Sequence, residues 1–191
     1  ISVAVEMGYE YFRYSPCWID NAAVGKGYLD AAQVAVCLAA YIRELGYPAK
    51  AHFFINEQVL HVPIAVEAGI GELGRNNILI TAKYGPRLRL ATVTTDLPMA
   101  IDKPVDLGLQ RLCTLCRKCA VCCPSQSIPH GDKVVVRGVE KWQTDQDRCV
   151  KFWMANPQKW NDCGRCISVC PWNKPDVWWH RMGASLSASY L

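Results

Sequence analysis

The stretch CTLCRKCAVCCP, residues 113–124, places four cysteines and a proline in the pattern C-x2-C-x2-C-x3-C-P. With this spacing a polypeptide wraps around one 4Fe-4S cluster and gives its last thiolate to a second cluster. The pattern therefore predicts a small module that carries electrons.

A second, shorter motif follows in CGRCISVCP, residues 163–171, which reads C-x2-C-x3-C-P. Its missing first cysteine would fall at Trp160, and Cys149 is the substitute that we expect. In two-cluster proteins the last cysteine of each motif binds the cluster of the other motif. This crossing assigns one cluster to Cys113, Cys116, Cys119 and Cys170, and the other to Cys123, Cys149, Cys163 and Cys166.

Paired C-x2-C units also occur in structural zinc sites and in the disulfide frameworks of oxidising compartments. Three cysteines at successive three-residue steps followed by Cys-Pro suit a cubane better than a zinc site, whose cysteine pairs are separated by longer loops. Three cysteines remain outside both sets. We expect Cys37 and Cys122 to be packing residues, and Cys17 indicates no particular role.

The chain has 191 residues and a hydrophobic content of 51%, enough for one sizeable core beside a small cluster-binding module. Its longest nearly apolar run, residues 31–42, is interrupted by Gln33 and is shorter than the roughly 20 residues of a membrane span. We therefore expect no transmembrane helix in this sequence. Because the chain starts at Ile1 in an apolar stretch, we also expect an upstream segment, such as a signal peptide.

The formal net charge of +4 treats every cysteine as neutral. Two clusters with four thiolates each would carry about −2 apiece and would bring the holoprotein close to neutrality. Basic residues beside the cysteines would stabilise reduced clusters, although each is equally well explained as a solvated side chain. These residues are Arg117, Lys118, Arg165 and Lys174. Nothing resembles a continuous basic stripe, so we expect no nucleic-acid partner.

Helical and strand patterns alternate before the cysteines, which predicts a layered α/β domain. Apolar residues recur at helical spacing from about Tyr28 to Leu45, and Gly46 and Pro48 end the pattern. The other predicted elements are strands at 51–55, 78–81 and 88–95 and a short helix at 63–69. In the last strand, Arg87 and Arg89 should project to the face opposite Leu88 and Leu90. Lys103-Pro104 marks the boundary region, so the predicted units are residues 1–108 and 109–191.

Several ordered stretches across nearly the whole chain carry a family resemblance. They include Asn21-Ala22-Ala23-Val24-Gly25-Lys26-Gly27-Tyr28, Tyr41-Ile42-Arg43-Glu44-Leu45-Gly46-Tyr47, Gly71-Glu72-Leu73-Gly74-Arg75-Asn76, Tyr84-Gly85-Pro86-Arg87-Leu88-Arg89-Leu90, Thr95-Asp96-Leu97-Pro98 and both cysteine motifs. With these stretches the chain resembles the corrinoid-dependent reductive dehalogenases. Each stretch is weak by itself, but their order and spacing are specific. Family members are much longer, so we expect this chain to be a C-terminal fragment of the catalytic subunit.

The resemblance implies an α+β protein in which part of a nitroreductase-like, corrinoid-binding α/β domain precedes a ferredoxin-like module with two 4Fe-4S clusters. The implied cofactors are these clusters and a base-off cobamide. The family replaces a carbon–halogen bond by carbon–hydrogen with two electrons and one proton. The resemblance places the proton donor at Tyr28, the assisting residues at Asn56 and Arg89, and the corrinoid contacts at Thr81, Lys83, Tyr84, Gly85 and Arg87.

Elementary chemistry agrees with these roles, because tyrosine is protonated at neutral pH and a nearby arginine stabilises the phenolate that remains after donation. Without the resemblance, Tyr28 would be an ordinary aromatic near a helix start, Arg89 a surface strand residue and Asn56 a turn residue.

Two other functions stay open at the level of the sequence. Epoxyqueuosine reductase, a tRNA-modifying relative, would use an aspartate donor, for which Asp30 is available. A non-catalytic carrier with two clusters would explain the cysteines but not the α/β part. For a dehalogenase, the implied partners are an organohalide substrate, an electron-donor protein or quinol-linked donor, and a small membrane-anchor subunit. A respiratory member would lie on the outer face of the cytoplasmic membrane, and other members would be cytoplasmic.

Overall fold

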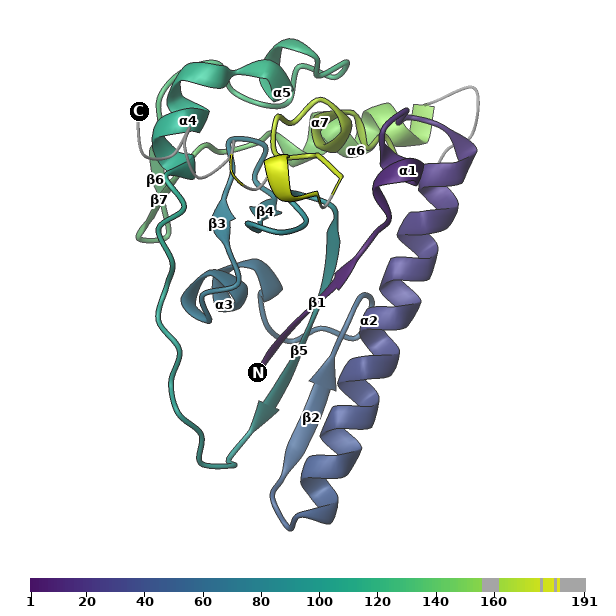
Figure 1. Ribbon diagram of the computed structural model, residues 1–191, viewed down its shortest axis with the longest axis vertical. Coiled ribbons are helices and arrows are strands. Elements are labelled where there is room, and N and C mark those ends of the chain that lie inside the picture. The colour runs from purple at the N-terminus through teal and green to yellow at the C-terminus, as the bar shows by residue number, and fades with distance from the viewer. Residues whose placement is uncertain (156–161, 176, 181, 183–191) are drawn as a thin grey trace.

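The computed structural model describes residues 1–155, 162–175, 177–180 and 182, and its centre is a three-stranded antiparallel sheet (Figure 1). The strand order is β1-β5-β2, so that β5 lies in the middle. The strands are β1 (Ser2–Glu6), β5 (Leu88–Thr95) and β2 (Ala49–His52). The predicted boundaries of β5 are confirmed. Both neighbours pair with β5, which fixes the direction of every side chain along it.

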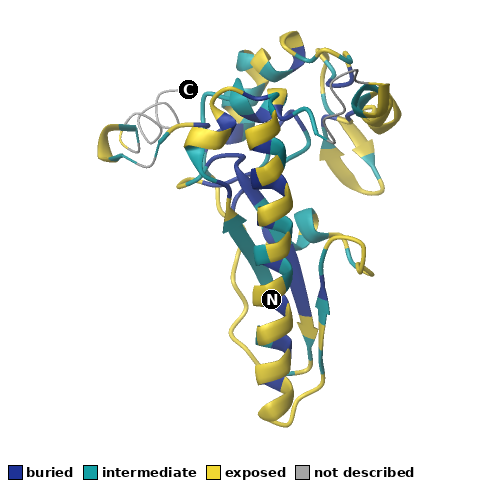
Figure 2. Ribbon diagram, turned by 90° about the vertical axis from the view of Figure 1, so that its right-hand side faces the viewer, coloured by how far each residue is buried: buried dark blue, intermediate teal, exposed yellow. Residues whose placement is uncertain are grey.

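Helix α2 (Trp18–Glu44) covers one face of this sheet along its whole length (Figure 1). Its buried side is built from small residues, with Ala31, Ala35 and Ala39 packed against Ala91 and Val93 of β5. The opposite side of the helix is exposed (Figure 2). Small residues let the helix approach the sheet closely, so every β5 side chain on this face is held in a defined position.

The start of α2 was predicted ten residues too late. The helix begins at Trp18, and the N–H of its N-cap residue, Cys17, donates to Asp20 Oδ1 at 2.7 Å. Gly25 and Gly27 have low helix propensity, but packing of this first part on the core overrides that preference. The predicted C-terminal stop at Gly46 is confirmed by its left-handed φ of 89°.

The second face of the sheet carries α3 (His61–Glu67), which packs on Leu88 through the buried Ala65. Next to it lies a short hairpin of β3 (Glu72–Leu73) and β4 (Leu79–Ile80). Side chains of β5 therefore alternate as predicted, with Leu88 toward α3 and Ala91 toward α2. The predicted helix at 63–69 and strand at 78–81 are present, with boundaries displaced by one or two residues.

The predicted strand at 51–55 is partly wrong, because β2 ends at His52. The chain turns at Phe53, where the N–H of Asn56 donates to the Phe53 carbonyl at 2.8 Å. Ile55 adopts a left-handed φ of 67°, which no strand residue has. Because Phe53 and Ile55 continue the apolar alternation of the strand, the sequence pattern did not show this turn.

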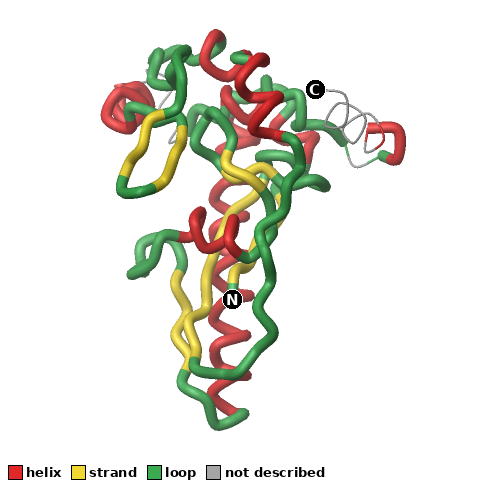
Figure 3. The backbone as a smooth tube through the Cα atoms, turned by 90° about the vertical axis from the view of Figure 1, so that its left-hand side faces the viewer, coloured by secondary structure: helices red, strands yellow, loops and turns green. Residues whose placement is uncertain are grey.

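The cysteine-bearing segments gather at one end of α2, next to α1 (Tyr9–Phe12) (Figure 1). An extended connection, residues 96–107, leads from β5 back along the molecule to this end (Figure 3). The elements there are α4 (Leu109–Cys116), α5 (Lys118–Val121), the hairpin of β6 (Val134–Val136) and β7 (Val139–Lys141), α6 (Gln146–Ala155) and α7 (Arg165–Ser168). Within the described ranges, no helix has both the length and the hydropathy required to cross a bilayer.

The turn at Gly85 brings the two parts of the chain into backbone contact. Gly85 has a φ of 58°, and a Cβ atom placed there would lie 2.1 Å from the Trp172 carbonyl oxygen. Only glycine fits, because a side chain would be strained and would also push the segment behind the last cysteine away.

We predict that Gly85→Ala lowers the free energy of unfolding by about 3 kcal/mol, as left-handed strain and overpacking add. Gly138→Ala is the matched control, since Gly138 also has a positive φ, of 82°, but open space around it. There we expect a loss of about 1 kcal/mol from strain alone. Urea denaturation followed by circular dichroism measures both, and equal losses would contradict the close approach at Trp172.

Candidate functional site

Four cysteine thiols line one cavity, and we call them the first thiol group: Cys113, Cys116, Cys119 and Cys170. The first two lie on α4 and the third on α5, whereas Cys170 follows α7. Burial, with a smaller contribution from the neighbouring thiols, raises the pKa of Cys119 to about 11 and that of Cys170 to about 12. These two thiols therefore resist ionisation unless a positive partner is bound.

The second thiol group consists of Cys123, Cys149, Cys163 and Cys166, which interact electrostatically with one another. Position 160, where the motif lacks a cysteine, lies outside the described residues, whereas Cys149 reaches the group from α6. The helices that carry Cys119 and Cys166, α5 and α7, contact each other, so the two groups are neighbours. The structure thus brings together the same two sets that the sequence pattern assigns.

Cys123 differs from the other thiols of its group. Burial alone would raise its pKa, but hydrogen bonds with the Ser125 and Ser127 hydroxyls, both at 3.3 Å, and with backbone N–H groups lower the pKa to about 7. Such hydroxyls stabilise a thiolate. The loop around Cys123 therefore stabilises the ionised form of this thiol, which is the form that binds a metal.

The donor sets fit iron–sulfur clusters. All eleven cysteines are free, so none of these thiols is used in a disulfide. In the described part of the chain, no three His, Cys, Asp or Glu side chains converge as a single metal ion would require. Each group offers four soft sulfur donors, and those of the first group line one cavity, which suits a cluster with an iron at each corner.

Both half-motifs contain the same backbone turn. The residue that follows Cys116 is Arg117 with a φ of 48°, and the residue that follows Cys163 is Gly164 with a φ of 58°. Each turn starts a one-turn helix that carries the next cysteine, Cys119 or Cys166. The spacing C-x2-C therefore encodes one local structure twice.

Arg75 is a buried cation beside the first thiol group, with an exposed fraction of only 2%. Its guanidinium donates to the carbonyls of Cys113, Pro129 and Gly131, each at 2.9 Å. It also lies 4.5 Å from the ring centroid of Trp142. This side chain joins the cysteine helix to the loop that follows it and places positive charge at the cavity.

Glu72 holds the same helix from its N-terminal end. Its Oε2 accepts hydrogen bonds from the N–H groups of Leu107 at 2.6 Å and Leu109 at 3.2 Å. A carboxylate in this position satisfies free helix donors and complements the helix dipole. Nearby, the Asn76 amide donates to the Cys166 carbonyl at 3.4 Å, so this one short segment contacts both cysteine motifs.

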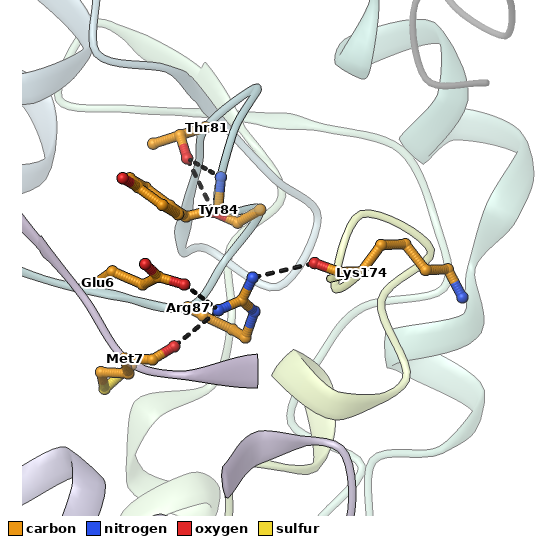
Figure 4. Close-up of polar contacts among 7 residues, drawn as sticks. Glu6, Met7, Thr81, Tyr84, Arg87 and Lys174 are labelled. Carbon is orange, nitrogen blue, oxygen red and sulfur yellow. Dashed lines mark hydrogen bonds and ion pairs between the residues drawn. The ribbon is translucent and has the colours of Figure 1, made fainter. Parts of the chain in front are cut away.

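Arg87 is fully buried, and it connects the sheet to the C-terminal segment (Figure 4). It donates to Glu6 at 2.9 Å, to the Met7 carbonyl at 2.7 Å and to the Lys174 carbonyl at 3.0 Å. These bonds give the residue a structural function in addition to any contact with a cofactor.

The other residues with a predicted corrinoid contact form a tight loop beside Arg87 (Figure 4). Thr81 and Gly85 exchange backbone hydrogen bonds of 3.0 Å, and the Tyr84 N–H donates to the Thr81 hydroxyl at 3.0 Å. Lys83 is exposed at the tip, with its ammonium 4.8 Å from the Tyr84 ring centroid. The loop is rigid at its base and polar at its tip.

Tyr28 and Arg89 meet on the α2 face of the sheet. The Arg89 guanidinium lies over the Tyr28 ring, 4.7 Å from its centroid, and Phe54 stacks on the same ring at 4.3 Å. Asn56 is exposed, two residues beyond Phe54 in the turn after β2. The structure thus brings Tyr28 and Arg89 into contact and places Asn56 in the adjoining turn.

Asp162 completes this arrangement, although sequence reasoning missed it. Its Oδ2 lies 3.4 Å from Arg89, while its Oδ1 accepts the N–H of Cys163 at 2.7 Å. Burial raises the pKa of Asp162, while Arg89 and the Cys163 N–H oppose that rise. The only sequence signal was an aspartate directly before a turn that carries a cysteine.

Comparisons with known proteins show the family to which this chain belongs. Residues 112–174 match the model of a 4Fe-4S dicluster domain. The tetrachloroethene reductive dehalogenase of Desulfitobacterium hafniense is 44% identical over an alignment of 191 positions. This alignment covers 94% of this chain and 34% of that protein. This chain belongs to the reductive dehalogenase family. Its mixed α/β fold matches the solved structure of a B12-dependent reductive dehalogenase. The TM-score is 0.94, and the sequences are 38% identical over 99% of this chain and 28% of the other.

The chain spans about a third of the length of the curated relatives that it matches. Iron–sulfur clusters and a corrinoid are the cofactors that the dicluster match and the B12-dependent relative support. An epoxyqueuosine reductase bound to a tRNA stem loop is more distant, with 23% identity and a TM-score of 0.55 over 74% of this chain and 37% of that one. That similarity concerns the fold alone.

We predict that Arg75→Ala lowers the free energy of unfolding by about 3 kcal/mol, because several buried carbonyls lose a charged donor. Arg43→Ala is the control, since Arg43 also donates to a carbonyl, that of Ala49 at 2.9 Å, but is exposed. Its loss should stay below about 0.5 kcal/mol. Urea denaturation measures the difference, and equal losses would argue against Arg75 as the fixing point of α4.

Proposed function

We propose that the protein containing this chain catalyses reductive dehalogenation, R–X + 2e⁻ + H⁺ → R–H + X⁻. The observation that carries the proposal is the contact of Tyr28 with Arg89 directly beside the loop of the second thiol group. A proton donor and an electron path therefore meet at one place, in a member of a dehalogenase family.

The two thiol groups are the proposed ligands of two 4Fe-4S clusters. Cys113, Cys116, Cys119 and Cys170 would hold one, and Cys123, Cys149, Cys163 and Cys166 would hold the other. Since α5, which carries Cys119, packs against α7, which carries Cys166, the two clusters would lie next to each other. Residues 109–191 then form the ferredoxin-like unit.

Residues 1–108 form, in this proposal, part of a nitroreductase-like domain that binds the corrinoid. When bound, the corrinoid supplies the cobalt at which the carbon–halogen bond is broken. The loop Thr81–Gly85 would contact it through Lys83 and Tyr84, while Arg87 holds the loop against the C-terminal segment. The Arg89 Nε is buried without a hydrogen-bond partner among the described residues, which leaves a donor for a bound group.

Tyr28 is the proposed proton donor. Its phenol holds the proton at Oη, Phe54 fixes the ring by stacking, and Arg89 supplies the positive charge that stabilises the phenolate after donation. Asn56 would assist from the neighbouring turn. These contacts leave the aromatic ring few alternative positions, which favours a defined geometry for donation.

The chemistry of the relatives suggests chlorinated ethenes as the first substrates to test. An electron-donor protein or quinol-linked donor would load the clusters. If the protein is respiratory, it would associate with the outer face of the cytoplasmic membrane through a small anchor subunit; the alternative is a cytoplasmic enzyme.

Two alternatives predict different measurements. An epoxyqueuosine reductase would use Asp30, but Asp30 pairs with Lys26 on an exposed part of α2. A simple electron carrier would take up no cobalt. Cobalt analysis of the full-length protein, purified without oxygen in the presence of corrinoid, separates a carrier from an enzyme.

We predict that Cys170→Ala halves the iron and acid-labile sulfide content, from about eight to about four iron atoms per chain, since one cluster loses a ligand. Cys122→Ala is the matched control, because this exposed cysteine lies between two ligand positions and in neither group. It should keep full iron. Loss of iron in the control, or its retention in Cys170→Ala, would contradict the assignment.

We predict that Tyr28→Phe in the full-length enzyme lowers kcat for halide release about 100-fold, because general acid catalysis is lost, with both clusters intact. Tyr41→Phe on the exposed side of the same helix should leave kcat unchanged. Halide release from tetrachloroethene with a low-potential one-electron donor measures both. Unchanged turnover would reject Tyr28 as donor, and a wild-type protein inactive on a panel of organohalides would reject the activity.

A further inference from the structure

One carboxylate, that of Asp162, binds two separate parts of the site. Its Oδ1 accepts the N–H groups of Cys163 at 2.7 Å and Gly164 at 3.3 Å, which closes the turn that carries the cysteine. Its Oδ2 faces Arg89 at 3.4 Å. A displacement of this carboxylate would therefore affect the cysteine turn and the arginine together.

Arg89 is held between this carboxylate and helix α2. A Cβ atom at Gly27 would lie 3.0 Å from Arg89 Cγ, so the glycine makes room for the arginine stem. The head of the side chain then lies over the Tyr28 ring at 4.7 Å. Gly27 thus fixes the path of the stem, whereas Asp162 fixes the orientation of the charged end.

The ion pair is shielded from water, since the side chains of Arg89 and Asp162 are only 16% and 14% exposed. A cation at this depth requires a counter-charge, and Asp162 is its ion-pair partner in the described part of the chain. The Tyr28 ring face attracts the guanidinium more weakly than a carboxylate does. The position of Arg89 over the ring therefore depends on Asp162.

We propose that Asp162 is a positioning residue that holds Arg89 over Tyr28 and connects this pair to the turn of Cys163. The inference rests on the proposed function, in which Tyr28 donates the proton and Cys163 binds a cluster. In this arrangement the proton-donating side chains and the cysteine turn share one carboxylate, so their relative placement is fixed by a single group.

The test uses the full-length protein, purified without oxygen, in three variants: Asp162→Asn, Arg89→Met and the double variant. Asparagine keeps an oxygen for the N–H groups of the turn but removes the charge that faces Arg89. We expect kcat for halide release from tetrachloroethene to fall at least tenfold in Asp162→Asn, with KM within threefold of the wild type. Because Asp162 acts through Arg89, the double variant should be no slower than Arg89→Met.

A readout that does not depend on turnover is the midpoint potential of the clusters, followed by EPR during a redox titration. Removal of a negative charge next to Cys163 should make one potential more positive. Asp162→Glu keeps the charge but lengthens the side chain, so we expect a reduced kcat at the wild-type potential. This variant also keeps the test decisive if Asp162→Asn does not retain iron.

Asp20→Asn is the matched control, because Asp20 is a buried carboxylate on the other side of Gly164 that bonds to the Cys17 N–H instead. Its kcat should stay within threefold of the wild type. Wild-type kcat in both Asp162 variants, multiplied losses in the double variant, or an unchanged potential in Asp162→Asn would overturn the proposal. If the wild type releases no halide, the proposed function fails, and the potential of Asp162→Asn alone decides whether Asp162 links to the cluster.

Discussion

The whole arrangement depends on buried charged side chains of the α/β part that are satisfied by the backbone of the cysteine segments. Glu72 binds the N-terminus of α4, Arg75 binds carbonyls within and after the first motif, and Arg87 binds the Lys174 carbonyl after the second. An ionised group buried without partners would cost several kcal/mol, so these bonds stabilise the packing of the cysteine segments on the α/β part. If the cysteine segments separated from the sheet, these charged side chains would lose hydrogen-bond partners or become exposed to solvent.

This constraint explains how a module with little regular structure can be placed accurately against the proposed catalytic side chain. The one-turn helices α5 and α7 are too short to be stable alone. Their positions come instead from hydrogen bonds to the α/β part, such as that of Asn76 to the Cys166 carbonyl. The proposed electron transfer and proton donation would both require fixed distances, which these buried polar contacts between the two parts of the fold would maintain.

Sequence patterns predicted those features of the fold and of the site that depend on residues close together in the chain. The cysteine spacing predicted the four thiols that line one cavity, and the alternation from Leu88 to Thr95 defined the central strand. The early start of α2 was missed because tertiary packing overrides the low helix propensity of Gly25 and Gly27. Arg75 and Asp162 were not recognised because their partners lie 38 and 73 residues away, and no sequence period records such contacts.

The two half-motifs are equivalent in their local turn but not in their surroundings. In the first motif, the residue with left-handed backbone angles is Arg117, and its exposed position leaves room for a side chain. In the second motif it is Gly164, where a Cβ atom would lie 2.7 Å from Asp20 and 2.9 Å from Ser15. The second turn is therefore pressed against the start of α2, the helix that also carries Tyr28. Through Asp162, which bonds both to the Cys163 N–H and to Arg89, the turn of Cys163 is also the one that contacts the proposed catalytic pair.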